Sequence, residues 1–142
     1  MKKIIISSFL TALFLLISFS ITEKADAAYH PWQKFKEFGS TCEVRAWTDY
    51  LSYGRTATTV DFFLEQRGNC GTLSYSAGVE GSYWNAISSL ETGSFANRTP
   101  VKKSRIFSGV TGVTEKGTLV ARLTKGKIYA DYNKGNVLTF RY

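Results

Sequence analysis

Apolar and polar side chains alternate along two segments in the first half of the chain, 42–51 and 58–65. A period of two is typical of a β-strand that buries one of its faces. One face of the second segment carries Thr58, Val60, Phe62 and Leu64. Turn signals at Gly54 and at 67–69 bound these segments. A Ser- and Gly-rich segment, 70–79, is predicted as a further strand.

The C-terminal part alternates in the same way over 118–124 and 127–132, with a turn at Lys125-Gly126 between them. The length of the next turn decides the register of the last strand. A two-residue loop would send its apolar side chains to the polar face. A three-residue loop, 133–135, keeps them together and puts Gly135 at the left-handed position that such loops need. The sequence therefore predicts a hairpin with two facing pairs, Ala130 with Leu138 and Ile128 with Phe140.

The remaining segments are less regular. Trp32, Phe35 and Phe38 recur at intervals of three, which predicts a short helical turn near the start of the exported chain. Residues 80–100 include a helical spacing of apolar residues, but their Ser and Gly content favours a strand with loops. The basic cluster 102–105 is predicted as a connection that leads to a strand over Ile106–Val113.

These patterns predict an all-β domain, either a small antiparallel β-sandwich or a small barrel, with six to seven strands. Short strands at spacings near ten residues, joined by Gly-rich turns, resemble immunoglobulin- or fibronectin-like sandwiches in general pattern only. The spacing of Cys, Trp and Cys in antibody domains is absent, because Trp47 lies only five residues after Cys42.

The N-terminus predicts export. Lys2 and Lys3 precede an apolar run over 4–21, and Ala25-Asp26-Ala27 follows it. This order is typical of a cleaved secretory signal peptide over residues 1–27. An uncleaved anchor is the alternative, and nothing after residue 28 resembles a second span. The prediction is a secreted single domain over 28–142.

Two cysteines, Cys42 and Cys70, remain in the predicted exported chain. In an oxidising compartment such a pair usually forms a disulfide. Two free thiols, or a catalytic one, are the alternative, but the chain has no Cys-x-x-Cys motif. We therefore predict a Cys42–Cys70 bond.

Charge is unevenly distributed along the predicted exported chain. Residues 28–97 carry five basic and seven acidic side chains, whereas 98–142 carry ten basic and two acidic ones. Such asymmetry indicates an anionic partner, although a solvated sheet face would also be polar and basic. The predicted register brings Arg122 opposite Tyr129 for a cation–π contact. The residues predicted to bind an anion are Lys102, Lys103, Arg105, Arg122, Lys125, Lys127, Tyr129, Lys134 and Arg141.

The sequence contains few residues or motifs that indicate catalysis. His30 is the single histidine, so a His-based triad or zinc site would depend on a residue predicted to lie in a mobile end. We predict no metal, because two cysteines cannot complete a zinc site alone, and no cofactor, because no nucleotide-binding loop is present. The Gly-x-Ser-x-Gly elbow of hydrolases is absent as well. Asp61 and Glu65 share a strand face about 13 Å apart, which leaves a carboxylate-dependent glycoside hydrolase as the less favoured function.

Aromatic residues suggest a second kind of binding. Flat rings stack on sugars, but large aromatic side chains also dominate the cores of small domains. Trp47 and Trp84 are the candidates for exposure. The residues considered for a sugar-stacking platform are Trp32, Trp47, Tyr50, Tyr53, Tyr83 and Trp84.

The sequence therefore predicts a secreted, non-enzymatic binding protein with a basic sheet face. Its expected partner is an anionic envelope polymer, a lipid surface or an acidic protein, and not a specific nucleic acid. An antagonistic or antimicrobial protein is one form of this hypothesis. The alternative is a secreted protein-binding inhibitor or matrix component.

Overall fold

The computed structural model describes residues 27–82 and 85–142, and within these residues the chain forms strands and no helix. Residues 1–26 of the predicted signal peptide lie outside the described part. The strands are β1 (Ala28–Tyr29), β2 (Gln33–Lys34), β3 (Glu43–Thr48), β4 (Ser52–Tyr53), β5 (Thr59–Arg67), β6 (Leu73–Gly81), β7 (Glu91–Phe95), β8 (Lys102–Arg105), β9 (Thr114–Lys125), β10 (Ile128–Tyr132) and β11 (Val137–Arg141).

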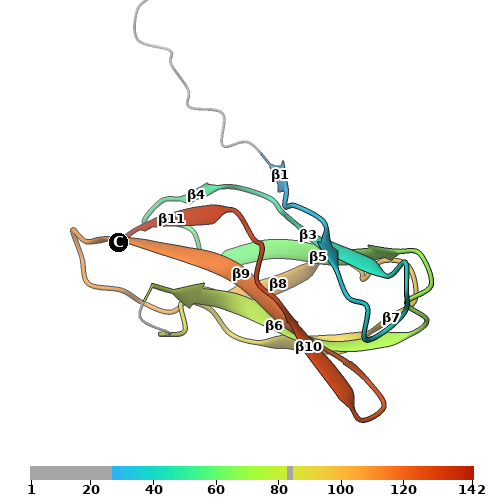
Figure 1. The fold of residues 1–142 in the computed structure, drawn as a ribbon. Coiled ribbons are helices and arrows are strands. Elements are labelled where there is room, and N and C mark those ends of the chain that lie inside the picture. Colours follow the sequence, from blue (N-terminus) through green and yellow to red (C-terminus); the bar gives the residue numbers. More distant parts are fainter. Residues whose placement is uncertain (1–26, 83–84) are drawn as a thin grey trace, which may run out of the picture.

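The strands form two sheets that lie one over the other (Figure 1). The first sheet has the order β1-β3-β5-β8, with β2 also paired to β3. The second has the order β4-β11-β9-β6-β7, with β10 also paired to β9. The predicted all-β sandwich is confirmed. Its eleven strands exceed the expected number partly because β1, β2 and β4 have only two residues each, too few to show an alternation.

The core lies between the two sheets and follows the predicted alternation. Val44, Ala46, Val60, Phe62 and Leu64 of the first sheet are completely buried. The second sheet contributes Leu119, Ala121, Leu123, Leu138 and Phe140. Burial of such an aliphatic or aromatic side chain stabilises the fold by about 1.5–3 kcal/mol. All members of the core cluster come after residue 27, so the predicted exported chain contains the whole described core.

The predicted Cys42–Cys70 disulfide is present, with a Cα–Cα distance of 4.6 Å. Cys42 comes directly before β3, and Cys70 lies between β5 and β6. Because β5 is in the first sheet and β6 is in the second, the bond fastens the β5–β6 connection to the start of β3.

The predicted hairpin between the last two strands is wrong. β10 and β11 do not pair with each other, and both pair with β9 along different parts of its length. Tyr132 lies opposite Ala121, and Val137 lies opposite Thr118. Gly135 has no left-handed backbone. It passes so close to β9 that an added Cβ would lie 2.7 Å from the carbonyl oxygen of Leu119.

Two further expectations about secondary structure are wrong. Residues 102–105, predicted as a connection, form strand β8, whose only buried side chain is Ser104. An edge strand that buries one small hydroxyl shows no apolar alternation. The predicted strand over Ile106–Val113 is instead a loop that follows a single bridge at Ile106.

At the N-terminus, the predicted helical turn is also replaced by short β pairing. Gln33 and Lys34 form β2, and a turn follows at 36–38. Phe35 and Phe38 are buried and stack with a centroid distance of 5.8 Å. Their interval of three residues in the sequence therefore comes from a turn that buries both rings. The strand expected in the middle of the chain is present as β7. Tyr83 and Trp84 lie outside the described residues.

Candidate functional site

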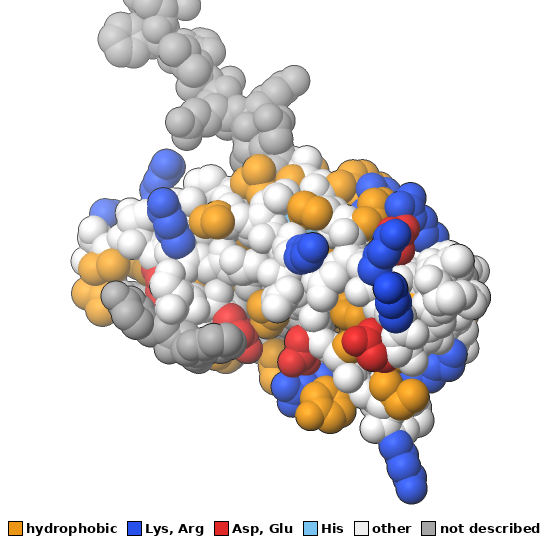
Figure 2. Space-filling model, viewed as in Figure 1, with side chains coloured by type: hydrophobic (Ala, Val, Ile, Leu, Met, Phe, Trp, Pro, Cys, Tyr) orange, Lys and Arg blue, Asp and Glu red, His pale blue; other side chains and the backbone are white. Residues whose placement is uncertain are grey.

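The residues predicted to bind an anion fall into two groups, because they lie towards opposite ends of β9. Arg141 pairs with Thr114 at the start of β9, and Ile128 pairs with Lys125 at its end. These ends are about 36 Å apart at the rise of an extended strand. In the face shown by Figure 2, Lys and Arg side chains form several separate groups.

The group at the β9–β10 hairpin contains Arg122, Lys125, Lys127 and Tyr129. Arg122 lies opposite Asp131 rather than opposite Tyr129. Its Nε atom lies 2.9 Å from Oδ1 of Asp131, and this pairing raises its pKa. The expected cation–π contact with Tyr129 is still present, at 5.4 Å from the ring centroid. The Nζ atom of Lys125 donates to the carbonyl oxygen of Phe38 at 2.9 Å.

Lys134 is exposed in the connection between β10 and β11, beside this hairpin. Lys102 and Lys103 lie on β8, the edge strand of the first sheet. The Nζ atom of Lys103 is 3.6 Å from Oδ2 of Asp61. Thus part of the predicted basic surface is already neutralised by neighbouring carboxylates.

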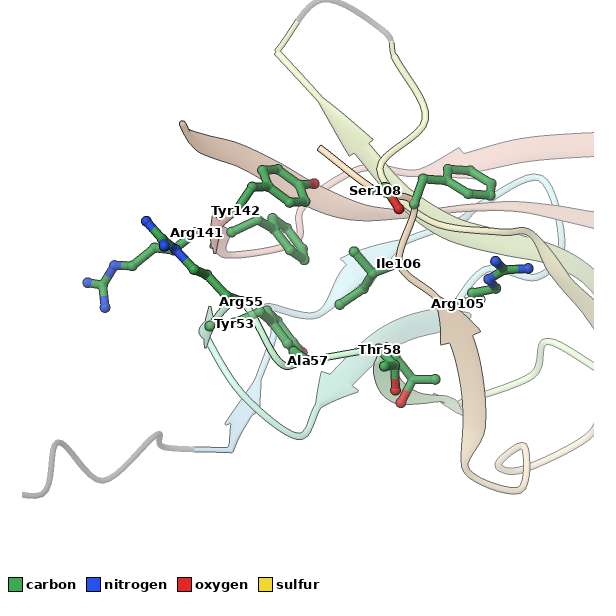
Figure 3. A pocket seen from close by; sticks show the side chains of 13 residues that line it. Tyr53, Arg55, Ala57, Thr58, Arg105, Ile106, Ser108, Arg141 and Tyr142 are labelled. Atoms are coloured by element: carbon green, nitrogen blue, oxygen red, sulfur yellow. The ribbon is translucent and has the colours of Figure 1, made fainter. Parts of the chain in front are cut away.

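Arg105 and Arg141 come from different sheets and line the same cavity, which has a volume of about 550 Å³. Arg55, in the β4–β5 connection, lines it as well. In Figure 3, Arg55 and Arg141 extend to the same side of the cavity, and Arg105 lies on the other side. Ile106 projects between Tyr142 and Ala57. We call this site the arginine cavity; its lining is Tyr53, Gly54, Arg55, Ala57, Thr58, Thr59, Arg105, Ile106, Phe107, Ser108, Phe140, Arg141 and Tyr142.

The lining of the arginine cavity includes two stacked aromatic rings. Tyr53 and Phe140 are buried and stack in parallel with a centroid distance of 5.0 Å. Behind the ring, the hydroxyl of Tyr53 donates to Oδ1 of Asp49 at 2.8 Å. Burial raises the pKa of both Tyr53 and Asp49. No Asp or Glu occurs among the described residues that line the cavity, so its fixed side-chain charges are positive.

Two other cavities differ in charge. They lie over the outer side of β9, with volumes of about 380 Å³ and 460 Å³. The first contains Lys116 and Glu80, and the second contains Arg122 together with Glu80 and Asp131. Because acids and bases are mixed in both, neither matches an anionic ligand as well as the arginine cavity does.

Aromatic and arginine side chains alternate on the outer face of the first sheet. The guanidinium of Arg45 lies 4.0 Å from the ring centroid of Tyr29 and 4.6 Å from that of Trp32. Arg67 lies 4.3 Å from the centroid of Trp32. Trp47 is half-buried and stacks on Phe63 at 5.0 Å. These aromatic rings therefore have protein partners, as expected for rings that stabilise a sheet.

The two carboxylates considered for hydrolysis also have partners. Glu65 pairs with Arg45. Asp61 accepts a hydrogen bond from the hydroxyl of Thr59 at 2.9 Å and lies near Lys103. Neither lines the arginine cavity. The geometry thus gives both side chains a structural role on the outer face of the first sheet.

His30 is buried, which corrects the expectation that it lies in a mobile end. The backbone N–H of Asn136 donates to its Nδ1 atom at 2.7 Å, and Nε2 lies 3.1 Å from Oγ1 of Thr48. Burial lowers the pKa of His30 to about 4. In residues 27–82 and 85–142, no group of three or more His, Cys, Asp or Glu side chains is placed to hold a metal ion.

The same described ranges contain no helix with the length and apolar character needed to cross a membrane. Sequence reasoning found Arg105 and Arg141 through the excess of basic residues after position 97. It missed Arg55, which lies in a connection without periodicity. Tyr53 was considered for sugar stacking, but its partner Phe140 was not, because the two rings come from separate strands, β4 and β11.

Comparison with known proteins places the chain in a family. A curated relative, cell wall-binding protein YqgA of Bacillus subtilis (strain 168), is 38% identical over 105 residues, which cover 72% of this chain and 73% of the relative. No solved structure matches the chain. The YqgA MG2 macroglobulin domain matches residues 25–140, most of the length and both sheets of the sandwich, so the chain belongs to this domain family.

Proposed function

We propose that this protein is an exported, non-enzymatic binding protein that holds an anionic polymer of the cell envelope in the arginine cavity. The observation that carries the proposal is a cavity lined by three arginines and four aromatic residues, with no acid among its described lining residues. The relative that is named a cell wall-binding protein supports an envelope polymer as the ligand.

The chemistry of the lining fits a polymer that carries phosphate or carboxylate groups. A guanidinium presents a planar set of donors that matches both anions. Arg55, Arg105 and Arg141 flank the opening, so a chain crossing it would meet cations on both sides (Figure 3). The rings of Tyr53 and Phe140 offer an apolar base against which a sugar or a polyol backbone packs.

The rest of the molecule supports binding rather than catalysis. The carboxylates of Asp61 and Glu65 have cationic partners on the outer face of the first sheet. His30 has both ring nitrogens within the described hydrogen-bond network. A reaction would need a group that exchanges protons or attacks a substrate, and the described lining residues include no carboxylate, histidine or thiol.

Charge-matched variants test the site. In one, Arg55, Arg105 and Arg141 are changed to Gln; in the other, Lys125, Lys127 and Lys134 are changed to Gln. Both lose the same net charge, but only the first alters the arginine cavity. Binding is measured on soluble poly(glycerol phosphate) and polygalacturonate, and on wall fractions with and without their phosphate-containing polymers.

We expect the arginine variant to lose at least about tenfold in affinity, equivalent to about 1.4 kcal/mol, and the lysine variant to lose much less. Binding should weaken as salt rises, because screening shortens the range of the cationic field. Equal losses would mean that net charge alone drives binding. Unchanged binding by both variants, together with weak salt dependence, would favour the protein-binding alternative.

A further inference from the structure

The loop between β8 and β9 exposes an unusual amount of apolar surface. Phe107, Val110 and Val113 are 45%, 71% and 47% exposed. They lie in the segment that was expected to form a strand and that leaves the sheets after Ile106. This loop is beside the C-terminus at one end of the molecule (Figure 1). Single exposed apolar residues are ordinary, but a cluster of them in one loop marks an interaction site.

Backbone contacts fix the loop in this exposed arrangement. The N–H of Val113 donates to the carbonyl oxygen of Val110 at 3.0 Å, which closes a turn. Gly112 has a φ of 84° within it, a conformation that favours glycine. The N–H of Gly112 donates to the carbonyl oxygen of Tyr142 at 2.7 Å. The apolar side chains are therefore held outward by an ordered turn.

Gly109 adds a second constraint. An added Cβ at this position would overlap the ring of Tyr142, so the loop lies directly against that ring. Tyr142 in turn lines the arginine cavity together with Phe107. The apolar loop and the arginine cavity thus occupy the same end of the sandwich.

Basic residues flank the loop in the sequence and line the adjoining cavity, and one acid, Glu115, interacts with Tyr142 beside it. Arg105 comes directly before it, Lys116 follows at the start of β9, and Arg55 and Arg141 line the cavity that Phe107 also lines. Residues 106–114 contain no acid. The nearest acid in the sequence, Glu115, accepts a hydrogen bond from the side chain of Asn85. Figure 2 shows apolar side chains at this end with Lys and Arg side chains beside them.

We propose that the β8–β9 loop docks this end of the protein onto an anionic lipid bilayer. Val110 at the turn, with Phe107 and Val113 beside it, would enter the boundary between headgroups and acyl chains. The flanking cations would remain at the level of the anionic headgroups. Apolar burial and attraction to anionic lipid reinforce one another in interfacial binding. The site does not depend on the polymer proposed for the cavity.

The combination of apolar and cationic groups favours an anionic bilayer over a protein partner. Exposed apolar side chains of the turn adjoin a cavity that Arg55, Arg105 and Arg141 line. A bilayer offers both matching parts, with apolar material inside and anionic groups at its surface. Docking in this direction would hold the arginine cavity near the membrane surface.

Vesicle co-sedimentation tests the proposal with residues 28–142, which contain the whole described core. The vesicles are phosphatidylcholine alone and phosphatidylcholine mixed with an equal amount of phosphatidylglycerol. Val110→Asp places a charge on the turn, and Ile128→Asp is the control, since Ile128 is 48% exposed at the far end of β9. Thermal unfolding checks that both variants fold.

We expect the parent to bind the anionic vesicles and to bind phosphatidylcholine weakly. Val110→Asp should lower partitioning by at least about tenfold, and Ile128→Asp should leave it within about twofold. A parent that stays in solution, or a Val110→Asp variant that partitions like the parent, overturns the proposal. Val110→Asp should still bind soluble poly(glycerol phosphate), so a failure of lipid docking is distinguishable from a failure of the arginine cavity.

Discussion

The backbone N–H of Asn136 donates a 2.7 Å hydrogen bond to Nδ1 of His30, across 106 residues of sequence. This bond ties the segment after β1 to the connection between β10 and β11. Since Nδ1 accepts, the imidazole proton lies on Nε2, which faces Oγ1 of Thr48 at 3.1 Å. Neutral imidazole satisfies both contacts, whereas a protonated ring would set two N–H groups against each other at Asn136.

The first prediction is a loss of stability in mild acid. The pKa of His30 falls from 6.5 to about 4 on folding because the ring is buried. Between pH 6.5 and about pH 4, His30 is protonated in the unfolded chain but stays neutral in the folded chain. The free energy of unfolding therefore decreases as the pH falls through this range. Linkage gives a decrease of about 2 kcal/mol between pH 7 and pH 5. Urea unfolding at a series of pH values measures it.

The control is His30→Gln, which removes the only histidine. This variant should be less stable than the parent at pH 7, because the Asn136 contact is altered. Its stability should change little between pH 7 and pH 5, since carboxylates titrate mostly below that range. A parent-like pH slope in this variant would show that another group is responsible.

The wrong register predicted for the C-terminal strands shows what apolar periodicity cannot detect. The alternation of 118–124 is visible, but β9 begins earlier, at Thr114, and its first residues pair with β11. Residues 114–117 have no apolar side chain, so periodicity cannot detect them. Gly117 is buried there, and an added Cβ would lie 2.6 Å from Cδ1 of Ile87. Because Gly117 has no side chain, the side chain of Ile87 occupies the inward position at this point of β9.

The second prediction follows from the close passage of Gly135 over β9. In Gly135→Ala, the new methyl group would lie 2.7 Å from both Leu119 O and Thr118 Cγ2. The connection would have to shift, and such overpacking costs about 1–3 kcal/mol. Chemical denaturation measures the loss. Gly54→Ala is the control, because no described heavy atom lies within 4 Å of its added Cβ; an equal loss in both would argue against the close approach.

The same register explains how much of the candidate site was predictable. In the expected hairpin, Arg141 would lie beside Lys127 and the basic residues would form one surface. In the structure, Arg141 pairs with Thr114 at the other end of β9. Residue type alone identified the cations, but their grouping depends on the strand pairing. Arg55 lies near Arg105 and Arg141 only because of the fold, since its segment has no sequence pattern that predicts this position.

The third prediction concerns the Cys42–Cys70 bond. It closes a loop with a sequence separation of 28, and loss of such a cross-link destabilises a domain by about 3–4 kcal/mol in the chain-entropy treatment. The double variant Cys42→Ser/Cys70→Ser should show this loss in urea unfolding. Reductant should destabilise the parent and leave the double variant unchanged. Two titratable thiols in unreduced, denatured protein would contradict the bond.

The last prediction separates stacking from charge on the outer face of the first sheet. Arg45 lies between the rings of Tyr29 and Trp32 and pairs with Glu65. Arg45→Lys keeps the charge but loses the flat guanidinium that stacks on both rings. Cation–π contacts contribute about 0.5–1 kcal/mol each at partly exposed sites, so we expect a loss of about 1–2 kcal/mol in urea unfolding.

A double-mutant cycle with Trp32→Leu identifies the cause. If stacking carries the effect, Arg45→Lys should destabilise the Trp32→Leu background by about 0.5–1 kcal/mol less than it destabilises the parent. Arg98→Lys is the matched control, because among the described aromatic residues Arg98 lies over the ring of Phe63 alone, 4.9 Å from its centroid. Additive effects of Arg45→Lys and Trp32→Leu would show that the Arg45–Trp32 contact contributes no stability, and the loss in Arg45→Lys would then come from Tyr29 or Glu65.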